Sequence, residues 1–216
     1  MAAPTKGIGI ANEGIISTKL GMKGIPALAE ELQVARNLFL LEYTGGKLHI
    51  PTISTQGSIK LIKEAKAKGL NVTCSVAVHN LVLNDEILMG FDSRYKVLPP
   101  LREEATRKAL VEAVLDGTID CITSDHNPLD IELKKLEFDL AKDGTIGLES
   151  AFGALLTILP LEVVVEKLNA NKLVFNTENP SIGIDNKADI SLFTTGDNWT
   201  FGKENILSKS KNSAFL

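Results

Sequence analysis

The chain has 216 residues, of which 44% are hydrophobic and 23% charged, and a formal net charge of −4. This length allows one domain or two small ones, and the composition is ordinary for a globular protein that buries a core. The acidic balance argues against nucleic acid or an anionic membrane surface as the main partner, because either would favour a basic patch.

The first strand and helix signals lie in the N-terminal third. The first 24 residues are rich in glycine and predict a loop, after which apolar residues recur at helical spacing from Ile25 to Tyr43. Gly45-Gly46 then predicts the end of that helix. Lys47 to Ser54 alternates as a short strand, and Ser58 to Lys68 returns to the helical period. This part of the chain therefore predicts a strand followed by a helix.

The same order of elements repeats downstream. Asn71 to His79 predicts a strand rich in β-branched residues, Glu103 to Leu115 an amphipathic helix, and Ile119 to Asp125 another strand. Gly147 to Leu159 predicts a further apolar helix. Strands that alternate with helices are typical of a parallel α/β sheet or barrel.

The number of strand–helix units is small for a closed barrel. We count about three clear units, whereas a complete eight-unit barrel takes about 250 residues. A parallel sheet with two open edges should not be stable alone. We therefore expect partner strands from residues beyond this sequence, or, as the less favoured alternative, from another chain.

The C-terminal part changes character. A short helix is predicted after Pro160, and residues 169–187 resemble a loop. Ala188 to Phe193, with Trp199 and Phe201 beyond it, predicts one or two strands outside the barrel. We therefore expect a barrel portion over residues 1–186 and strands of a small β-sandwich domain over residues 187–216.

The cysteines and the apolar runs bear on location. Cys74 and Cys121 each lie in an apolar run without metal-binding spacing, which favours two reduced, buried thiols over a disulfide. No apolar stretch approaches the roughly 18 residues needed to span a bilayer, and no signal core follows the N-terminus. We therefore expect a cytoplasmic protein.

Six segments resemble class I dihydroorotases. A single match would be weak, but six in the family's order over nearly the whole chain indicate homology and place the chain from about the fourth barrel helix onward. The segments are Leu48–Thr55, Val78–Leu81, Tyr95–Arg102, Thr123–Pro128, Gly144–Glu149 and Lys187–Asp189.

The resemblance implies a fold and a chemistry. The fold is an incomplete TIM-like (β/α)8 metal-dependent hydrolase barrel. In the family, zinc is held by an N-terminal HxH, a bridging carboxylated lysine or aspartate, a histidine after each of strands five and six, and an aspartate after strand eight. The metals generate hydroxide and polarise the ring amide of dihydroorotate, while the aspartate shuttles the proton. The product is N-carbamoyl-aspartate, and the reaction is a reversible step of pyrimidine biosynthesis.

Two residues of this chain match the metal-binding positions. The resemblance makes His79 the strand-six ligand, with a polar core or pocket residue as the alternative. It makes Asp125 a metal ligand and the proton shuttle, with a helix cap or a salt bridge as the alternative. His126 has the opposite strand parity to Asp125 and is expected to be structural.

The strand-five histidine of the family is replaced by Thr52. His49 does not substitute for it by pattern, because on a period-two strand it shares a face with Pro51 and Ile53 rather than with Thr52. We therefore expect His49 to point away from the metal position and to be a hydrogen-bonded structural residue.

The substrate-binding positions also differ from the family. Leu98 replaces the asparagine before Pro-Pro, and Leu129 replaces the histidine that closes the TDHxPH signature. Each loss leaves polar ligand atoms unpaired, at a cost of about 1–3 kcal/mol. Arg102 remains and could contact a substrate carboxylate, with an exposed arginine at a helix start as the alternative.

Three hypotheses follow. The first is a dihydroorotase-like cyclic amidohydrolase that binds zinc and a small cyclic amide and forms a homo-oligomer. The second is a catalytically inactive dihydroorotase-like scaffold or regulatory partner of aspartate transcarbamoylase, which the replaced positions favour. The third is a hydrolase with an altered substrate and a single metal, using His79 and Asp125 with ligands outside this sequence.

Overall fold

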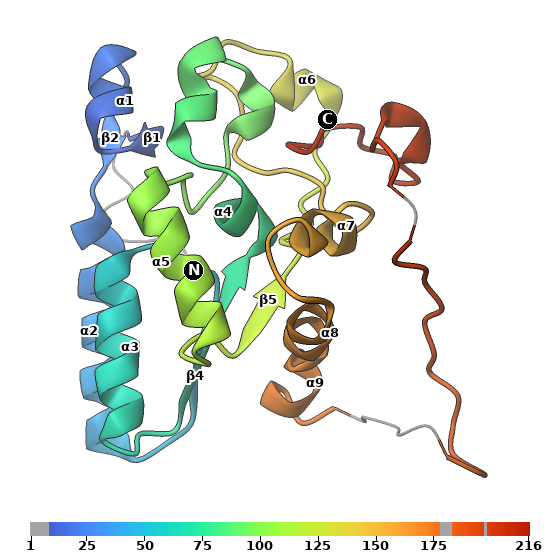
Figure 1. Ribbon diagram of the computed structural model, residues 1–216. Coiled ribbons are helices and arrows are strands. Elements are labelled where there is room, and N and C mark those ends of the chain that lie inside the picture. Colours follow the sequence, from blue (N-terminus) through green and yellow to red (C-terminus); the bar gives the residue numbers. More distant parts are fainter. Residues whose placement is uncertain (1–8, 178–182, 197) are drawn as a thin grey trace.

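The computed structural model describes residues 9–177, 183–196 and 198–216 (Figure 1). Its N-terminal part holds two short parallel strands, β1 (Ala11–Asn12) and β2 (Gly24–Ile25), with the helix α1 (Ile15–Lys19) between them. This part was expected to be a loop. The longer helix α2 (Ala27–Thr44) follows Pro26 and ends at Gly45, whose φ of 66° is a left-handed conformation that glycine adopts without a Cβ clash.

The central sheet has three parallel strands in the order β3-β4-β5. These are β3 (Leu48–Ile50), β4 (Val72–Ala77) and β5 (Cys121–Thr123), and the helices α3 (Gln56–Ala67) and α5 (Glu104–Leu115) connect them. In register, Ile50 lies opposite Cys74, and Ser75 lies opposite Cys121. The predicted alternation of strands and helices in a parallel sheet is confirmed.

Shorter elements occupy the connections. After β4 come α4 (Val78–Val82) and two 3-10 helices, η1 (Asp85–Gly90) and η2 (Ser93–Tyr95). After β5 come α6 (Ile131–Lys134), α7 (Ala151–Leu156), α8 (Leu161–Asn169), α9 (Asn171–Val174) and η3 (Lys203–Asn205). The strand expected to run to His79 therefore ends at Ala77, and the helix expected over 147–159 is shorter.

The core lies between the sheet and its helices. Alternate β4 residues, Val72, Cys74 and Val76, belong to the main apolar cluster, together with Ile62 of α3 and Leu110 of α5, both 0% exposed. Burying a side chain of this size stabilises the fold by about 1.5–3 kcal/mol. Helices α2, α3 and α5 lie side by side over the sheet (Figure 1), and α8 packs against β5.

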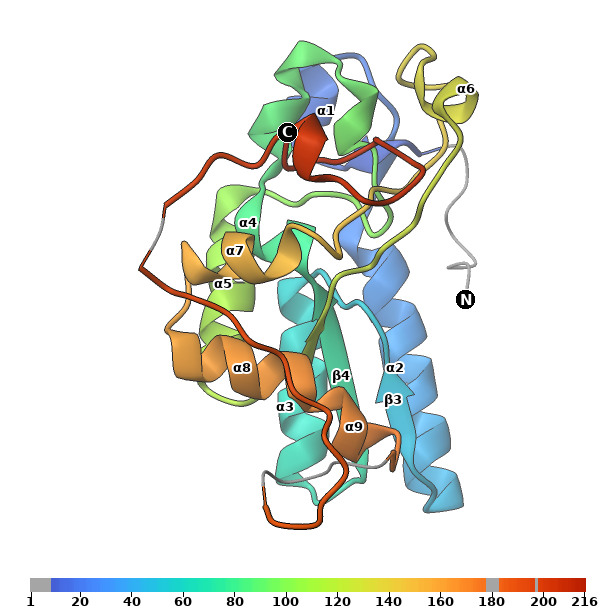
Figure 2. The same cartoon turned by 90° about the vertical axis from the view of Figure 1, so that its right-hand side faces the viewer.

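The strands predicted for the C-terminal segment are absent from its described residues. Within residues 183–196 and 198–216, the structure describes no strand, and the β-type pairing there is a bridge between Ser213 and Ile146. Ile190 and Leu192 are 67% and 98% exposed, so this stretch has a strand-like composition but no ladder. The segment passes along the outside of α7 and α8 (Figure 2), and Ile206 and Ala214 then return to buried positions. The proposed domain division at residue 187 stays a prediction.

In the part of the chain that the structure describes, no helix is long and apolar enough to cross a bilayer.

Candidate functional site

His79 lies immediately beyond β4, in the first turn of α4. Its side chain is 0% exposed, and among the described residues neither Nδ1 nor Nε2 has a hydrogen-bond partner. Burial lowers the pKa of His79 to about 4, so the ring is neutral near pH 7. Buried polar atoms are nearly always paired, and a neutral imidazole is a common metal ligand. This side chain is therefore the clearest mark of a site in the fold.

Asp125 follows β5 and faces His79. Its Oδ2 lies 4.0 Å from Nε2 of His79, beyond hydrogen-bond range, and its side chain is 35% exposed. Partial burial raises the pKa of the Asp125 carboxyl above its ordinary value. The backbone N–H of Asp125 donates to Oγ1 of Thr123 across 3.2 Å. The structure thus brings together the two residues that the sequence marked as metal ligands.

Thr52 completes a row of three positions. It follows β3, and its backbone N–H donates to Oγ of Ser75 on β4 across 3.1 Å. Thr52, His79 and Asp125 therefore follow three adjacent parallel strands. Thr52 and Asp125 have φ values of 48° and 46°, a left-handed conformation that is uncommon for residues other than glycine. Such backbone strain clusters at functional sites.

His49 is oriented differently from the prediction. It lies opposite Thr73 in register, and its Nδ1 is 2.9 Å from Oγ1 of Thr73, so it points to the same side of the sheet as Thr73. The expectation that His49 points to the opposite side of the sheet was wrong. It assumed that side chains alternate from His49 to Thr52, but β3 ends at Ile50 and the left-handed conformation of Thr52 breaks this alternation. His49 is the middle residue of β3 and also packs edge-on against Phe175. Its contacts are those of a structural histidine.

His126 also makes structural contacts. Its Nδ1 accepts hydrogen bonds from the backbone N–H groups of Gly147 and Leu148, both at 3.3 Å. A ring nitrogen that accepts from the backbone is not free to bind a ligand. The expected structural role of His126 therefore agrees with the geometry.

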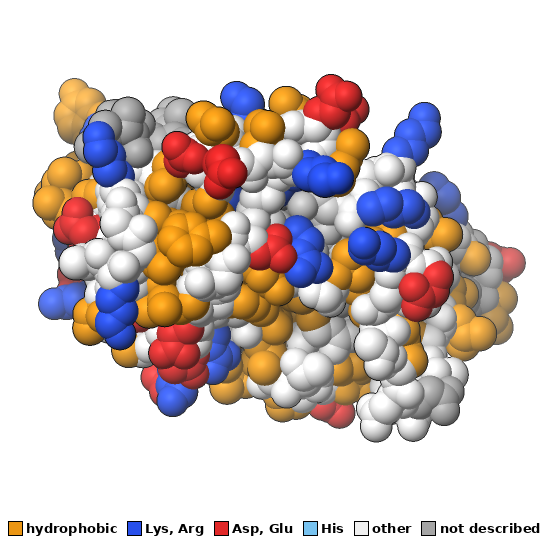
Figure 3. Space-filling model, turned by 90° about the horizontal axis from the view of Figure 1, so that it is seen from above, with side chains coloured by type: hydrophobic (Ala, Val, Ile, Leu, Met, Phe, Trp, Pro, Cys, Tyr) orange, Lys and Arg blue, Asp and Glu red, His pale blue; other side chains and the backbone are white. Residues whose placement is uncertain are grey.

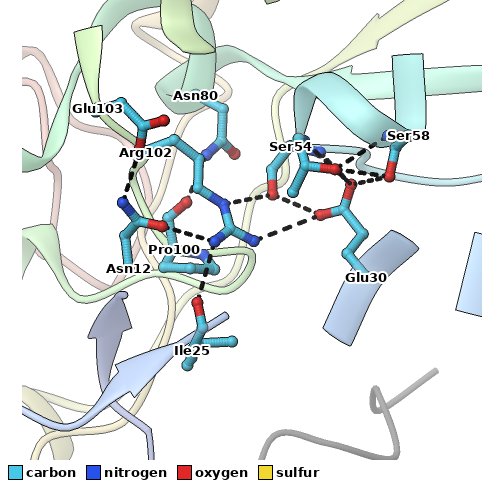
Figure 4. A network of polar contacts seen from close by, with 10 residues as sticks. Asn12, Ile25, Glu30, Ser54, Ser58, Asn80, Pro100, Arg102 and Glu103 are labelled. Carbon is cyan, nitrogen blue, oxygen red and sulfur yellow. Dashed lines mark hydrogen bonds and ion pairs between the residues drawn. The ribbon is translucent and has the colours of Figure 1, made fainter. Parts of the chain in front are cut away.

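Arg102 lies in a buried polar network near the same end of the sheet (Figure 4). It is 4% exposed, so the alternative of an exposed helix-start arginine was wrong. Its Nε donates to Oγ of Ser54 across 3.1 Å, and its Nη1 donates to Oδ1 of Asn12 and to the carbonyl of Ile25 across 2.8 and 3.2 Å. These bonds use Nε and Nη1, so a substrate carboxylate would have to approach Nη2, which lies 3.8 Å from Oε2 of Glu30.

Glu30 of α2 is the acidic partner in this network, and the sequence patterns did not mark it. Its carboxylate accepts hydrogen bonds from the backbone N–H groups of Ser54 and Thr55 and from the hydroxyl of Ser58 at 2.7 Å. Its Oε2 lies 3.8 Å from Nη2 of Arg102. The network therefore anchors the loop that carries Thr52.

Leu98 and Leu129 stand where the resemblance predicts polar substrate-binding residues. Leu98 and Leu129 are both half-buried, and Leu98 lines a cavity of about 780 Å³ between β3 and α2. Seen from this end, the surface mixes hydrophobic, basic and acidic side chains (Figure 3).

The donor set fits only part of a zinc site. Within residues 9–177, 183–196 and 198–216, no group of three or more His, Cys, Asp or Glu side chains is placed to hold a metal ion. His79 and Asp125 supply two donors, whereas catalytic zinc takes three protein ligands and a water molecule. Any metal held here therefore needs further ligands from outside the described residues.

Comparison with known proteins confirms the resemblance to dihydroorotases. The chain is 41% identical over 216 residues to the dihydroorotase of Geobacter metallireducens. The aligned region covers 97% of this chain and 51% of that protein. It is 43% identical over 216 residues to that of Pelotomaculum thermopropionicum, covering 96% and 50%. The chain spans about half the length of the curated relatives that it matches. No protein-family model matches the chain.

Solved structures show the same relationship. L-hydantoinase (dihydropyrimidinase) from Arthrobacter aurescens superposes with a TM-score of 0.65 and 25% identity, covering 78% of this chain and 42% of that one. An inactive dihydroorotase-like domain of the Chaetomium thermophilum CAD-like multifunctional protein superposes with a TM-score of 0.53 and 25% identity. This match covers 68% of this chain and 42% of that one. The neighbours are barrel amidohydrolases, which supports the α/β fold class.

Proposed function

We propose, from the similarity to curated dihydroorotases along 97% of the chain, that this chain forms part of a dihydroorotase-like cyclic amidohydrolase. Its substrate would be dihydroorotate, opened reversibly to N-carbamoyl-aspartate in pyrimidine biosynthesis. The observation that supports this most is His79, whose buried ring has two unpaired nitrogens among the described residues and lies 4.0 Å from Asp125.

The two residues would have different roles. His79 is fully buried and offers a nitrogen lone pair, so it would bind a zinc ion and help to fix its position. Asp125 is 35% exposed, and its raised pKa brings the carboxyl closer to neutral pH, so its Oδ2 would accept a proton from the attacking water and donate it to the ring nitrogen as the C–N bond breaks. Zinc, when bound, would polarise the amide carbonyl and lower the pKa of a bound water. His79 and Asp125 would hold it with ligands supplied from outside the described residues.

The test is steady-state hydrolysis of dihydroorotate by the purified protein, with its zinc content measured in parallel. Asp125→Asn should lower kcat by about 100-fold or more, the range for a lost general acid or base. Asp130→Asn is the matched control, because Asp130 is exposed and caps α6, a role that asparagine also fills. Equal activity of the two variants would remove Asp125 from the mechanism.

The second candidate function is a catalytically inactive scaffold or regulatory partner of aspartate transcarbamoylase. Thr52 favours it, because a hydroxyl occupies the position of the family's histidine, and one similar solved domain is itself described as inactive. This candidate function predicts a zinc content no higher than background, no hydrolysis of dihydroorotate, and co-purification with a transcarbamoylase. A homogeneous protein that hydrolyses dihydroorotate and does not bind the transcarbamoylase would exclude it.

A further inference from the structure

The pairing of β4 with β5 carries His79 and Asp125 to the same end of the sheet. Ala77 lies opposite Thr123 in the parallel register, and His79 and Asp125 each come two positions after one member of that pair. The register does not by itself direct the two side chains toward each other, because both residues lie beyond the last paired residues of their strands. Other contacts must therefore fix the direction of the Asp125 side chain.

The hydroxyl of Thr123 contacts the backbone of Asp125. Its Oγ1 accepts the backbone N–H of Asp125 across 3.2 Å. Threonine hydroxyls form such local turns with the backbone two residues on. Asp125 there has a φ of 46°, a left-handed conformation that costs free energy for a residue with a Cβ atom. The hydrogen bond from its N–H therefore stabilises a conformation that the residue type disfavours.

The carbonyl end of the same peptide group is in close contact with Gly147. A Cβ atom added at Gly147 would lie 2.5 Å from the carbonyl oxygen of Ser124, which is the oxygen of the peptide between Ser124 and Asp125. Glycine permits such a close approach of two backbone segments. Next to this contact, Nδ1 of His126 accepts the backbone N–H of Gly147 across 3.3 Å. The segment that begins at Gly147 is therefore packed directly on this peptide group.

We propose that Thr123 and Gly147 are positioning residues that hold the peptide group between Ser124 and Asp125 and so direct the Asp125 carboxylate toward His79. Thr123 binds the N–H of this peptide, and Gly147 leaves room for its carbonyl oxygen. Because φ of Asp125 sets the direction of its Cα–Cβ bond, rotation of the peptide would move Oδ2 from its place 4.0 Å from Nε2 of His79. The catalytic consequence rests on the function proposed above, whereas the geometry can be tested without activity.

The first measurement is the nitrogen chemical shift of the His79 ring in the full chain, which His79→Gln assigns by removing the signal. A carboxylate 4.0 Å away perturbs Nε2 electrostatically, so Asp125→Asn should shift this signal. Thr123→Val keeps the branched shape without the hydroxyl and should shift it in the same direction. Thr123→Ser keeps the hydroxyl and should leave it in place. A wild-type signal in Thr123→Val, or in Asp125→Asn, would overturn the proposal.

A pair of glycine variants tests the second contact. Gly147→Ala places a Cβ atom against the Ser124 carbonyl and should shift the His79 signal as Thr123→Val does. Gly153→Ala is the matched control, because Gly153 lies on α7 and a Cβ atom added there meets nothing within 4 Å. Urea denaturation checks that each variant folds. If Gly147→Ala does not fold, the two Thr123 variants decide, and equal signals in those two variants overturn the proposal.

Steady-state hydrolysis of dihydroorotate measures the consequence for catalysis. Thr123→Val should lower kcat by about 10–100-fold, since displacing a reacting group by about 1 Å costs on the order of 100-fold. KM should change little, because the contact acts on Asp125 rather than on substrate binding, and Thr123→Ser should retain the wild-type kcat. An unchanged kcat in Thr123→Val beside a loss in Asp125→Asn would overturn the proposal. The expected shifts without hydrolysis by any form would support the positioning of Asp125 and contradict the proposed function.

Discussion

The guanidinium of Arg102 and the carboxylate of Glu30 approach to 3.8 Å on either side of Ser54. The Ser54 hydroxyl accepts from Nε of Arg102 and donates to Oε2 of Glu30 across 2.5 Å. Both charged side chains are mostly removed from water, at 4% and 17% exposure. This pair joins α2 to the loop that leads from β3 and holds Thr52 in place.

Arg102→Met should lower the free energy of unfolding by about 3–5 kcal/mol, because it leaves the Glu30 carboxylate without its buried partner. Urea denaturation followed by circular dichroism measures this. Adding Glu30→Gln to Arg102→Met should recover part of the loss. Lys63→Met is the control: its pair with Asp116 is exposed, so the loss should stay below about 1 kcal/mol. Equal losses at Arg102 and Lys63 would contradict the importance of the network.

Thr52→His should create zinc affinity by adding a third donor beside His79 and Asp125. Histidine is among the residues that tolerate the left-handed conformation of this position. We expect zinc to bind at least about tenfold more tightly than to the unmodified chain, measured by competition with a chromogenic chelator. Thr52→Gln controls for side-chain size. A gain that survives removal of the His79 ring by His79→Ala would show that zinc binds elsewhere.

Leu110→Ala should destabilise the fold by about 2–5 kcal/mol, because Leu110 is 0% exposed in the main apolar cluster and its truncation leaves a cavity. Leu115→Ala lies on the same helix but at a position that is 53% exposed, so the expected change is about 0.5 kcal/mol or less. Thermal or urea unfolding compares the two variants. Similar effects would mean that α5 does not pack on the sheet through Leu110.

Cys74 and Cys121 should not react with a thiol reagent in the folded protein at pH 8 to 9. Both are 0% exposed, and burial raises the pKa of Cys74 to about 12 and that of Cys121 to about 11, from 9.0. Because the folded pKa values are raised, the stabilisation from these neutral thiols is complete below pH 9 and is lost as the pH rises toward 12. Titration with Ellman's reagent should find both thiols only after denaturation. Fast labelling of the native chain would show that β4 and β5 are accessible.

Long helices in which apolar residues recur at helical spacing were predictable from the sequence. The spacing of apolar residues predicted α2 and α5 within a few residues of their ends, although in α2 Leu28, Leu32 and Phe39 are exposed and Leu38 is buried. The end of β4 was not predictable, because the apolar run continues through Val78 into α4, and a short apolar run does not distinguish a strand from a buried helix. The resemblance marked His79 and Asp125, but their approach to 4.0 Å depends on β4 and β5 being neighbours.

The amino-acid order by itself determined most of the succession of strands and helices, and it placed Thr52, Leu98 and Leu129 where the resemblance predicts polar or metal-binding residues. These are local properties, since they depend on residue type and on spacing within one turn or one strand. The tertiary structure alone decided that Arg102 is buried against Glu30, that His49 faces Thr73, and that β4 lies between β3 and β5. Such contacts join residues far apart in the chain, and burial and hydrogen bonding at those sites exist only once the sheet has assembled.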